Sequence, residues 1–108
     1  MHERTRKLQF DAKTRQVIRD RDEWCIFCKV GYKPPKYSLP PTDIMHIVPR
    51  SQGGLGVERN GVYGCRAHHD LLDHTANRKE MMQYIENYMK GFYPDWNREE
   101  LYYRKGQI

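Results

Sequence analysis

The pattern of apolar and polar positions predicts two short strands followed by a short helix. Residues 43–48, DIMHIV, are apolar and partly β-branched, which is typical of a strand, and residues 61–64, GVYG, can pair back on them. The intervening residues 49–60 are rich in glycine and polar turn formers, which indicates a loop. Residues 66–73, RAHHDLLD, read as a helical turn or short helix. This part of the chain is therefore expected to form a ββα unit.

A longer helix is expected on each side of this unit. Asp11 can cap a helix over residues 12–23. After the unit, Asn77 and Glu80 have the spacing of a capping box and start a helix over residues 77–92. The apolar residues of this second helix recur at helical spacing and are expected to pack inward: Met81, Ile85, Tyr88 and Phe92.

The length and composition of the chain are those of one small domain with a thin core. The chain has 108 residues, of which 38% are hydrophobic, so a bound metal ion is expected to supply part of its stability. We expect an α+β domain with four parts. They are a flexible basic arm over residues 1–10, a metal-stapled ββα core over residues 20–75, a C-terminal helix over residues 77–92 and an aromatic tail over residues 93–108.

The charge of the chain favours an anionic partner. The formal net charge is +5 at pH 7, which favours nucleic acid first and an acidic membrane surface second. No segment of the sequence is long and apolar enough to cross a bilayer, and residues 1–10 have no apolar core of signal-peptide length. We therefore expect a cytoplasmic protein of a bacterial or phage-infected bacterial cell. Its three cysteines are then expected to be thiolates rather than a disulfide framework.

Four residues have the spacing of a structural zinc site. Cys25 and Cys28 form a C-x-x-C knuckle, and Cys65 and His68 form a C-x-x-H knuckle. The two-residue spacing lets both side chains of a knuckle reach one tetrahedral ion, and thiolate-rich ligation favours zinc over magnesium. We predict that this ion ties the N-terminal helix to the ββα unit. His69 is an alternative to His68 as the fourth ligand.

A further motif spans the predicted strand, loop and helix. It reads MHIVPRSQGG at residues 45–54, an asparagine at position 60, and CRAHH at residues 65–69. In this order the elements resemble the motif of the HNH endonuclease family, whose fold is called the ββα-metal fold. The resemblance covers about residues 20–75. The two knuckles are similar to those of the zinc-stapled branch of that family, and many such proteins are encoded by phages, prophages and mobile elements.

The resemblance implies a metal-dependent DNA endonuclease that hydrolyses phosphodiester bonds. His46 corresponds to the general base that takes a proton from the attacking water, a task that suits an imidazole with an ordinary pKa near working pH. Asn60 corresponds to the residue that supports the loop and orients the base. His69 corresponds to a ligand of the catalytic divalent ion, Mg2+ or Mn2+, which leaves His68 for zinc.

One position departs from the family pattern. The family commonly has Asp or His directly before the catalytic histidine as a metal ligand, whereas this chain has Met45, and a thioether is a poor ligand for Mg2+ or Mn2+. Asp73 can replace it, because a residue four positions after His69 projects from the same face of the predicted helix. Asp43 is a second candidate, to which we prefer Asp73, and His74 is a weaker one.

DNA is the expected partner. Arg50 and Arg66 are the candidates for phosphate contacts beside the active site. The resemblance implies contacts mainly with the duplex backbone, and therefore low sequence specificity. One active site cuts one strand, so a monomer or weak dimer is expected to nick DNA. The other basic residues that can neutralise phosphates are Arg4, Arg6, Lys7, Arg15, Arg78 and Lys79.

Met45 also motivates a second class of function. In this alternative the chain is a catalytically inactive, zinc-stapled module that binds DNA or assists phage DNA packaging, with phage packaging proteins as further partners. The retained His46, Asn60 and His69 favour the nuclease, because a binding module has no evident need for that trio.

Overall fold

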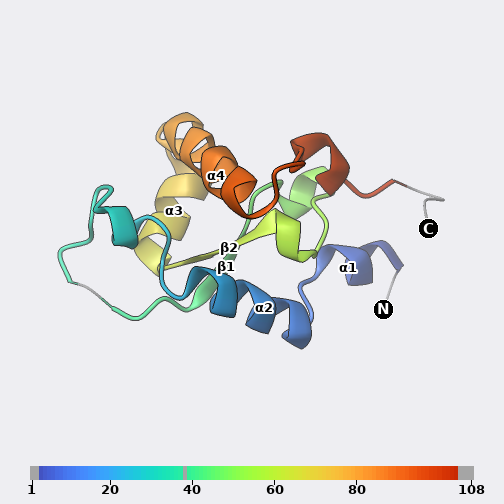
Figure 1. The fold of residues 1–108 in the computed structure, drawn as a ribbon, viewed down its shortest axis with the longest axis horizontal. Coiled ribbons are helices and arrows are strands. Elements are labelled where there is room, and N and C mark those ends of the chain that lie inside the picture. Colours follow the sequence, from blue (N-terminus) through green and yellow to red (C-terminus); the bar gives the residue numbers. More distant parts are fainter. Residues whose placement is uncertain (1–2, 38, 105–108) are drawn as a thin grey trace.

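A two-stranded antiparallel sheet lies between helices in the computed structural model, which describes residues 3–37 and 39–104 (Figure 1). Strand β1 (Asp43–His46) pairs with strand β2 (Gly61–Gly64), and helix α3 (Arg66–His74) follows β2 after one residue. The predicted order of strand, loop, strand and helix is therefore confirmed. None of the helices in these ranges is long and apolar enough to cross a membrane.

Helix α2 (Ala12–Asp22) packs on one side of the sheet. It begins as predicted, because the side chain of Asp11 accepts a hydrogen bond of 2.7 Å from the backbone N–H of Thr14. Ile18 is fully buried and packs with Phe10 and Ile44 in a small cluster. This small cluster joins α2 to the face of β1 on which His46 also lies, since alternate residues of a strand share a face.

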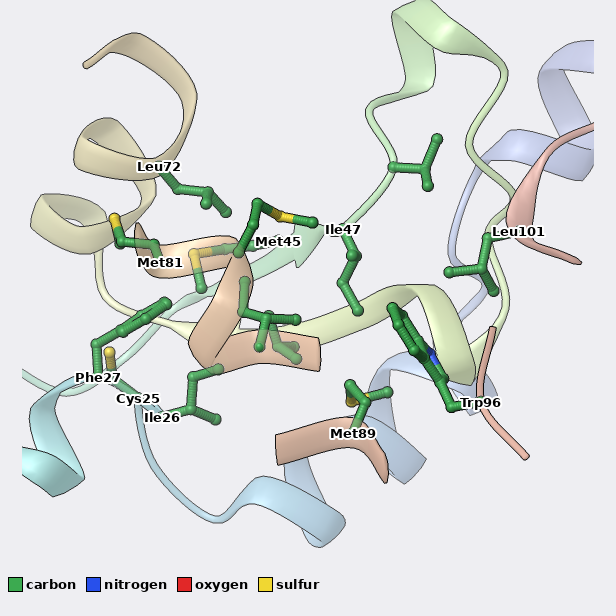
Figure 2. Close-up of a cluster of buried hydrophobic side chains, with 14 of the residues drawn as sticks. Cys25, Ile26, Phe27, Met45, Ile47, Leu72, Met81, Met89, Trp96 and Leu101 are labelled. Carbon is green, nitrogen blue, oxygen red and sulfur yellow. The ribbon is translucent and has the colours of Figure 1, made fainter. Parts of the chain in front are cut away.

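The main core lies on the other side of the sheet, under helices α3 and α4 (Arg78–Phe92). Figure 2 shows Met45 of β1 beside Leu72 of α3, with Ile47 extending toward Trp96; all of them belong to one buried cluster with Met81 of α4. Of the stripe predicted on α4, the first two residues are buried and the last is half-exposed. The predicted capping box does not form: Asn77 makes no side-chain cap bond in α4, and its amide donates instead to Thr75 Oγ1 at 3.0 Å.

The segment expected to be a flexible basic arm contains a helix and two buried side chains. Helix α1 (Glu3–Leu8) leads into an extended stretch, and both Leu8 and Phe10 are buried. The carbonyl of Lys7 accepts a hydrogen bond of 2.8 Å from the N–H of Gly56 in the inter-strand loop. The two apolar side chains thus anchor a mainly charged segment. The composition of the segment alone does not predict this packing. Residues 1–2 lie outside the described ranges.

The aromatic tail completes the main core. Trp96 and Leu101 are buried, and the indole N–H of Trp96 donates to the carbonyl of Arg59 at 2.8 Å. Tyr102 forms an isolated bridge with Gly54 in the inter-strand loop. Residues 105–108 of the predicted tail lie outside the described ranges. Within the described ranges the fold is completed by four short 3-10 helices, which span Cys28–Val30, Arg50–Gln52, Glu58–Asn60 and Arg98–Leu101.

A buried ion pair joins α2 to both the sheet and α4. Arg21 contacts both carboxylate oxygens of Asp22, at 2.7 and 2.9 Å, and donates to the carbonyl of Gly61 at 2.6 Å. Asp22 also accepts from the hydroxyl of Tyr88 at 2.7 Å and the backbone N–H of Tyr63 at 2.9 Å. Both charged groups of the pair therefore have hydrogen-bond partners, as a buried ion pair requires. The pair holds β2 against the end of α2, directly before the first cysteine knuckle.

Candidate metal centre and active-site cleft

The four residues of the predicted metal site come together. Cys25 and Cys28 lie on the turn after α2, Cys65 is the N-cap of α3, and His68 lies in the first turn of that helix. Their ligand atoms all lie within 4.8 Å of one another. The cluster therefore joins the segment after α2 to the start of α3, and it can hold a metal ion.

The distances in this cluster fit a tetrahedral ion. The Sγ atoms of Cys28 and Cys65 are 3.8 Å apart. Nδ1 of His68 lies 3.5 Å from the sulfurs of Cys25 and Cys28 and 3.2 Å from that of Cys65. A tetrahedron with metal–sulfur bonds of about 2.3 Å has sulfur–sulfur edges of about 3.8 Å. The soft thiolate-rich donor set suits zinc better than magnesium.

The backbone orients the imidazole of His68 toward the sulfurs. Its Nε2–H donates to the carbonyl of Tyr32, with a separation of 2.6 Å. This hydrogen bond places the proton on Nε2 and leaves the lone pair of Nδ1 directed at the cysteines, as metal-binding histidines usually require. The neighbouring His69 turns away from the cluster, so His68 is the histidine that meets the cysteines.

The thiol of Cys28 holds its proton firmly when no ion is present. Burial, together with the neighbouring Cys25 and Cys65, raises the pKa of Cys28 to about 12. Because thiolates are the ligating form, an ion that enters this site must displace protons, and its affinity falls as the pH falls.

A cleft beside the sheet contains the other predicted site residues. It has a volume of about 580 Å³ and receives side chains from β1, the inter-strand loop, α3 and the start of α4. The polar and charged residues of interest on its walls are His46, Arg50, His69, Asp73, His74 and Arg78. Four parts of the chain thus bring three histidines, a carboxylate and two guanidinium groups to one hollow.

His69 lies between two carboxylates. Its Nδ1 is 2.8 Å from Oδ2 of Asp43, and its Nε2 is 2.9 Å from Oδ2 of Asp73. Asp73 lines the cleft, whereas Asp43 does not. Burial opposes ionisation of Asp43, but hydrogen bonds from His69 and Thr42 and the charge of Arg66 hold the pKa of that carboxyl below its ordinary value.

His69 and Asp73 form a contacting pair that could supply two neighbouring ligands to a divalent ion. Adjacent oxygen or nitrogen ligands of an octahedral Mg2+ with bonds of about 2.1 Å lie about 3 Å apart, close to the observed 2.9 Å. Among residues 3–37 and 39–104, the Cys3His cluster is the one group of three or more convergent ligating side chains. Asp43 contacts Nδ1 of His69, the ring nitrogen opposite the one that Asp73 contacts. Asp43 therefore does not provide a third ligand atom in the cleft.

His46 is held by the N-terminal segment. Its Nε2–H donates to the carbonyl of Leu8 at 2.9 Å, and its ring lies against that of Phe10 with centroids 4.2 Å apart. Burial foremost, and then the charge of Arg50, lower the pKa of His46 below its ordinary value, against the opposing effects of the Leu8 bond and Asp73. A neutral imidazole with a proton on Nε2 leaves Nδ1 as a proton acceptor.

Asn60 fixes the inter-strand loop without reaching the cleft. It is fully buried. Its Oδ1 accepts from the N–H of Val48 at 2.8 Å, and its Nδ2 donates to the carbonyls of Val48 and Leu55 at 3.1 and 2.7 Å. It therefore ties together the two ends of the loop that follows His46.

Met45 and Arg66 lie away from the cleft. Met45 is fully buried in the main core, and a Cβ added to Gly64 would lie 2.5 Å from its Cε. Arg66 contacts Asp43 at 3.1 Å and Asp70 at 2.8 Å, so two carboxylates already occupy its guanidinium.

Arg78 lines the cleft, whereas the sequence indicated it only among the general phosphate contacts. Its guanidinium donates to the carbonyls of Leu72 at 3.2 Å and Ile47 at 3.0 Å, and it lies 3.6 Å from Asp73. Arg78 is the first residue of α4, and the spacing of residues in the sequence does not predict that the start of this helix reaches the cleft. Leu8 and Phe10 were missed for a similar reason, since their contacts with His46 depend on the tertiary fold.

Comparison of the chain with protein-family models, with curated proteins and with solved structures gives no match. The resemblance to the HNH motif therefore rests on the residues of the chain alone.

Proposed function

We propose that this protein is a metal-dependent endonuclease of the HNH type that nicks duplex DNA. The observation that carries the proposal is the cleft in which His46, His69 and Asp73 face one space beside Arg50 and Arg78. A potential base, a pair of metal ligands and two cations are the groups that phosphodiester hydrolysis requires. The net charge of +5 supports an anionic substrate.

In this proposal His46 is the general base. Its Nδ1 takes a proton from a water molecule, whose oxygen forms a bond to phosphorus while the bond from phosphorus to the leaving oxygen breaks. The leaving oxygen takes a proton from the solvent. The hydrogen bond from Nε2 to Leu8 fixes the ring, and the lowered pKa keeps it neutral near pH 7.

His69 and Asp73 would hold the catalytic ion, either Mg2+ or Mn2+. When bound, such an ion supplies Lewis acidity for the charge that builds up on the phosphate. Two protein ligands leave positions for substrate and water, which is the usual arrangement for Mg2+ at phosphate-processing sites. Arg50 lines the same cleft and would bind the phosphate oxygens, whereas Arg78, which already donates to two main-chain carbonyls, would contribute mainly its charge.

The Cys3His cluster would hold a zinc ion with a structural role. With four protein ligands the site is closed, as structural zinc sites are. It lies between the segment after α2 and the start of α3, the helix that carries His69 and Asp73. Zinc binding would therefore set the position of the cleft without taking part in the reaction.

The decisive experiment is a supercoiled-plasmid assay of wild type and His46→Ala, with Mg2+ or Mn2+ and without added divalent ion. A chelator is omitted so that the Cys3His cluster keeps its ion. We expect metal-dependent conversion to open circles by wild type and loss of conversion in the variant. Metal content and circular dichroism of both proteins serve as controls for the fold. Conversion at the wild-type rate by His46→Ala would show that the assigned base is wrong.

A second candidate function is a catalytically inactive, zinc-stapled DNA-binding or packaging-accessory module. The burial of Met45 favours it, because the residue before His46 cannot supply a ligand to the cleft. The same assay separates the two: this alternative predicts DNA binding without conversion of the plasmid by wild type under either metal.

A further inference from the structure

A second hollow continues the cleft past His46 toward the N-terminal segment. It has a volume of about 390 Å³ and is lined by Gln9, Phe10, Arg15, Ile44, His46 and Arg50. The last three of these residues also line the larger cleft. The two hollows therefore share a wall, and together they form one groove that passes over His46. We call this the His46 groove.

The N-terminal half of the His46 groove has a positive charge. Arg15 and Arg50 are exposed, and their side chains make no hydrogen bond or ion pair with residues 6–37 and 39–104. Among the side chains that the structure describes, those that line this half include no carboxylate. Arg66 differs, because Asp43 and Asp70 neutralise it. Two solvated guanidinium groups beside the proposed base are suited to contacts with phosphates.

Arg15 is presented by a well-anchored helix. Asp11 caps α2 four residues earlier, and Ile18, one turn later, is fully buried. Phe10 packs against both Ile18 and the ring of His46. The position of Arg15 relative to His46 is thus set by the same contacts that hold the base, so the arginine lies on a rigid wall of the groove.

We propose that duplex DNA lies along the whole His46 groove and that Arg15 contacts a backbone phosphate on the side of His46 away from Asp73. This inference rests on the proposed function for the identity of the partner, and it adds a second contact region that the HNH motif residues do not include. Helix α2 is then part of the DNA-binding surface as well as a packing element.

The test is the salt dependence of DNA binding by Arg15→Ala, with Lys13→Ala as the matched control. Lys13 is exposed on the same helix and lines neither half of the groove. Fluorescence anisotropy with a labelled duplex DNA, without added divalent ion or chelator, gives the slope of log K against log salt. Each lost phosphate contact lowers the magnitude of that slope by about 0.9. We expect this change in Arg15→Ala, a near-wild-type slope in Lys13→Ala, and recovery in Arg15→Lys.

The outcomes separate this inference from the proposed function. Equal slopes for Arg15→Ala and Lys13→Ala would overturn the inference, even if the wild type nicks plasmid. Failure of the wild type to bind the duplex, or tighter binding of a duplex RNA of the same length, would also overturn it. An Arg15-dependent slope in a protein that does not nick would support the groove and refute the nuclease. Unchanged thermal unfolding of the variants controls for the fold.

Discussion

The imidazole of His46 donates its Nε2–H to the main-chain carbonyl of Leu8, which lies 38 positions earlier in the chain and 2.9 Å away. The bond ties strand β1 to the segment that precedes α2. It also selects the tautomer in which Nδ1 can accept a proton. The orientation and protonation of the proposed base therefore depend on residues outside the HNH-like motif.

Replacement of Phe10 should change the titration of His46. The Phe10 ring covers the imidazole, and burial is the main cause of the low pKa of His46. In Phe10→Ala we expect this pKa to rise toward its ordinary value and the unfolding free energy to fall by about 3 kcal/mol. Phe10→Leu, which keeps an apolar cover, should change both quantities less. NMR titration of the imidazole measures the effect directly, and an unchanged pKa in Phe10→Ala would rule out this role of the ring.

Cleavage should have an acid limb set by His46. The base works only when neutral, so the rate should rise with pH as the imidazole loses its proton and then level off. Because burial, and then Arg50, lower the pKa of His46, the midpoint should lie below the ordinary histidine value of 6.5. Initial rates between pH 5 and 8 at constant salt check this. A midpoint above 6.5 would contradict the assignment of His46.

Removal of a zinc ligand should unfold the domain. Structural zinc sites contribute about 10 kcal/mol or more of apparent binding free energy, which is comparable with the whole stability of a small domain. We expect Cys65→Ser to lose bound zinc and most of its helical circular dichroism. Met45→Leu is the control, because it removes a buried sulfur that is not a ligand and should cost less than about 1.5 kcal/mol. Equal zinc content in wild type and Cys65→Ser would refute the site.

Asn60→Ala should destabilise the loop and slow cleavage, although Asn60 does not line the cleft. The substitution leaves the N–H and carbonyl of Val48 and the carbonyl of Leu55 without their partner. Unsatisfied buried groups of this kind cost about 1–3 kcal/mol each, so we expect a loss of about 3 kcal/mol in urea denaturation. Asn87→Ala, an exposed change on α4, is the matched control. Equal stability of the two variants would mean that the hydrogen bonds of Asn60 do not contribute to the free energy of unfolding.

The local features of the fold could be predicted from the sequence. The β-branched run before Pro49 and the short GVYG stretch predicted both strands. The cap at Asp11 could be predicted because its side chain accepts a hydrogen bond from the first turn of the helix that follows it. The spacing of the knuckles likewise predicted the Cys3His cluster, because each knuckle is a local structure.

Contacts between distant segments were beyond such reasoning. The Leu8 carbonyl next to His46 and the arrival of Arg78 in the cleft depend on how α1 and α4 pack. The capping box at Asn77 was wrong because Thr75 competes for its side chain. Sequence spacing also placed Asp43 and Asp73 in the same role, whereas they contact opposite nitrogens of His69.

This last difference gives a test of the catalytic ion. Asp73 lines the cleft beside Nε2 of His69, whereas Asp43 contacts Nδ1 and is also held by Arg66. Asp73→Asn should therefore weaken Mn2+ binding and cleavage by more than about 100-fold, because it removes a charged ligand and loss of an outer-shell partner alone costs about 10-fold to 100-fold. Asp43→Asn has the same change in charge and should have a smaller effect, because it alters only the support of the His69 ring. Mn2+ binding followed by electron paramagnetic resonance measures both variants without relying on activity. A greater loss of binding in Asp43→Asn would place the ion on the other side of His69 and outside the cleft.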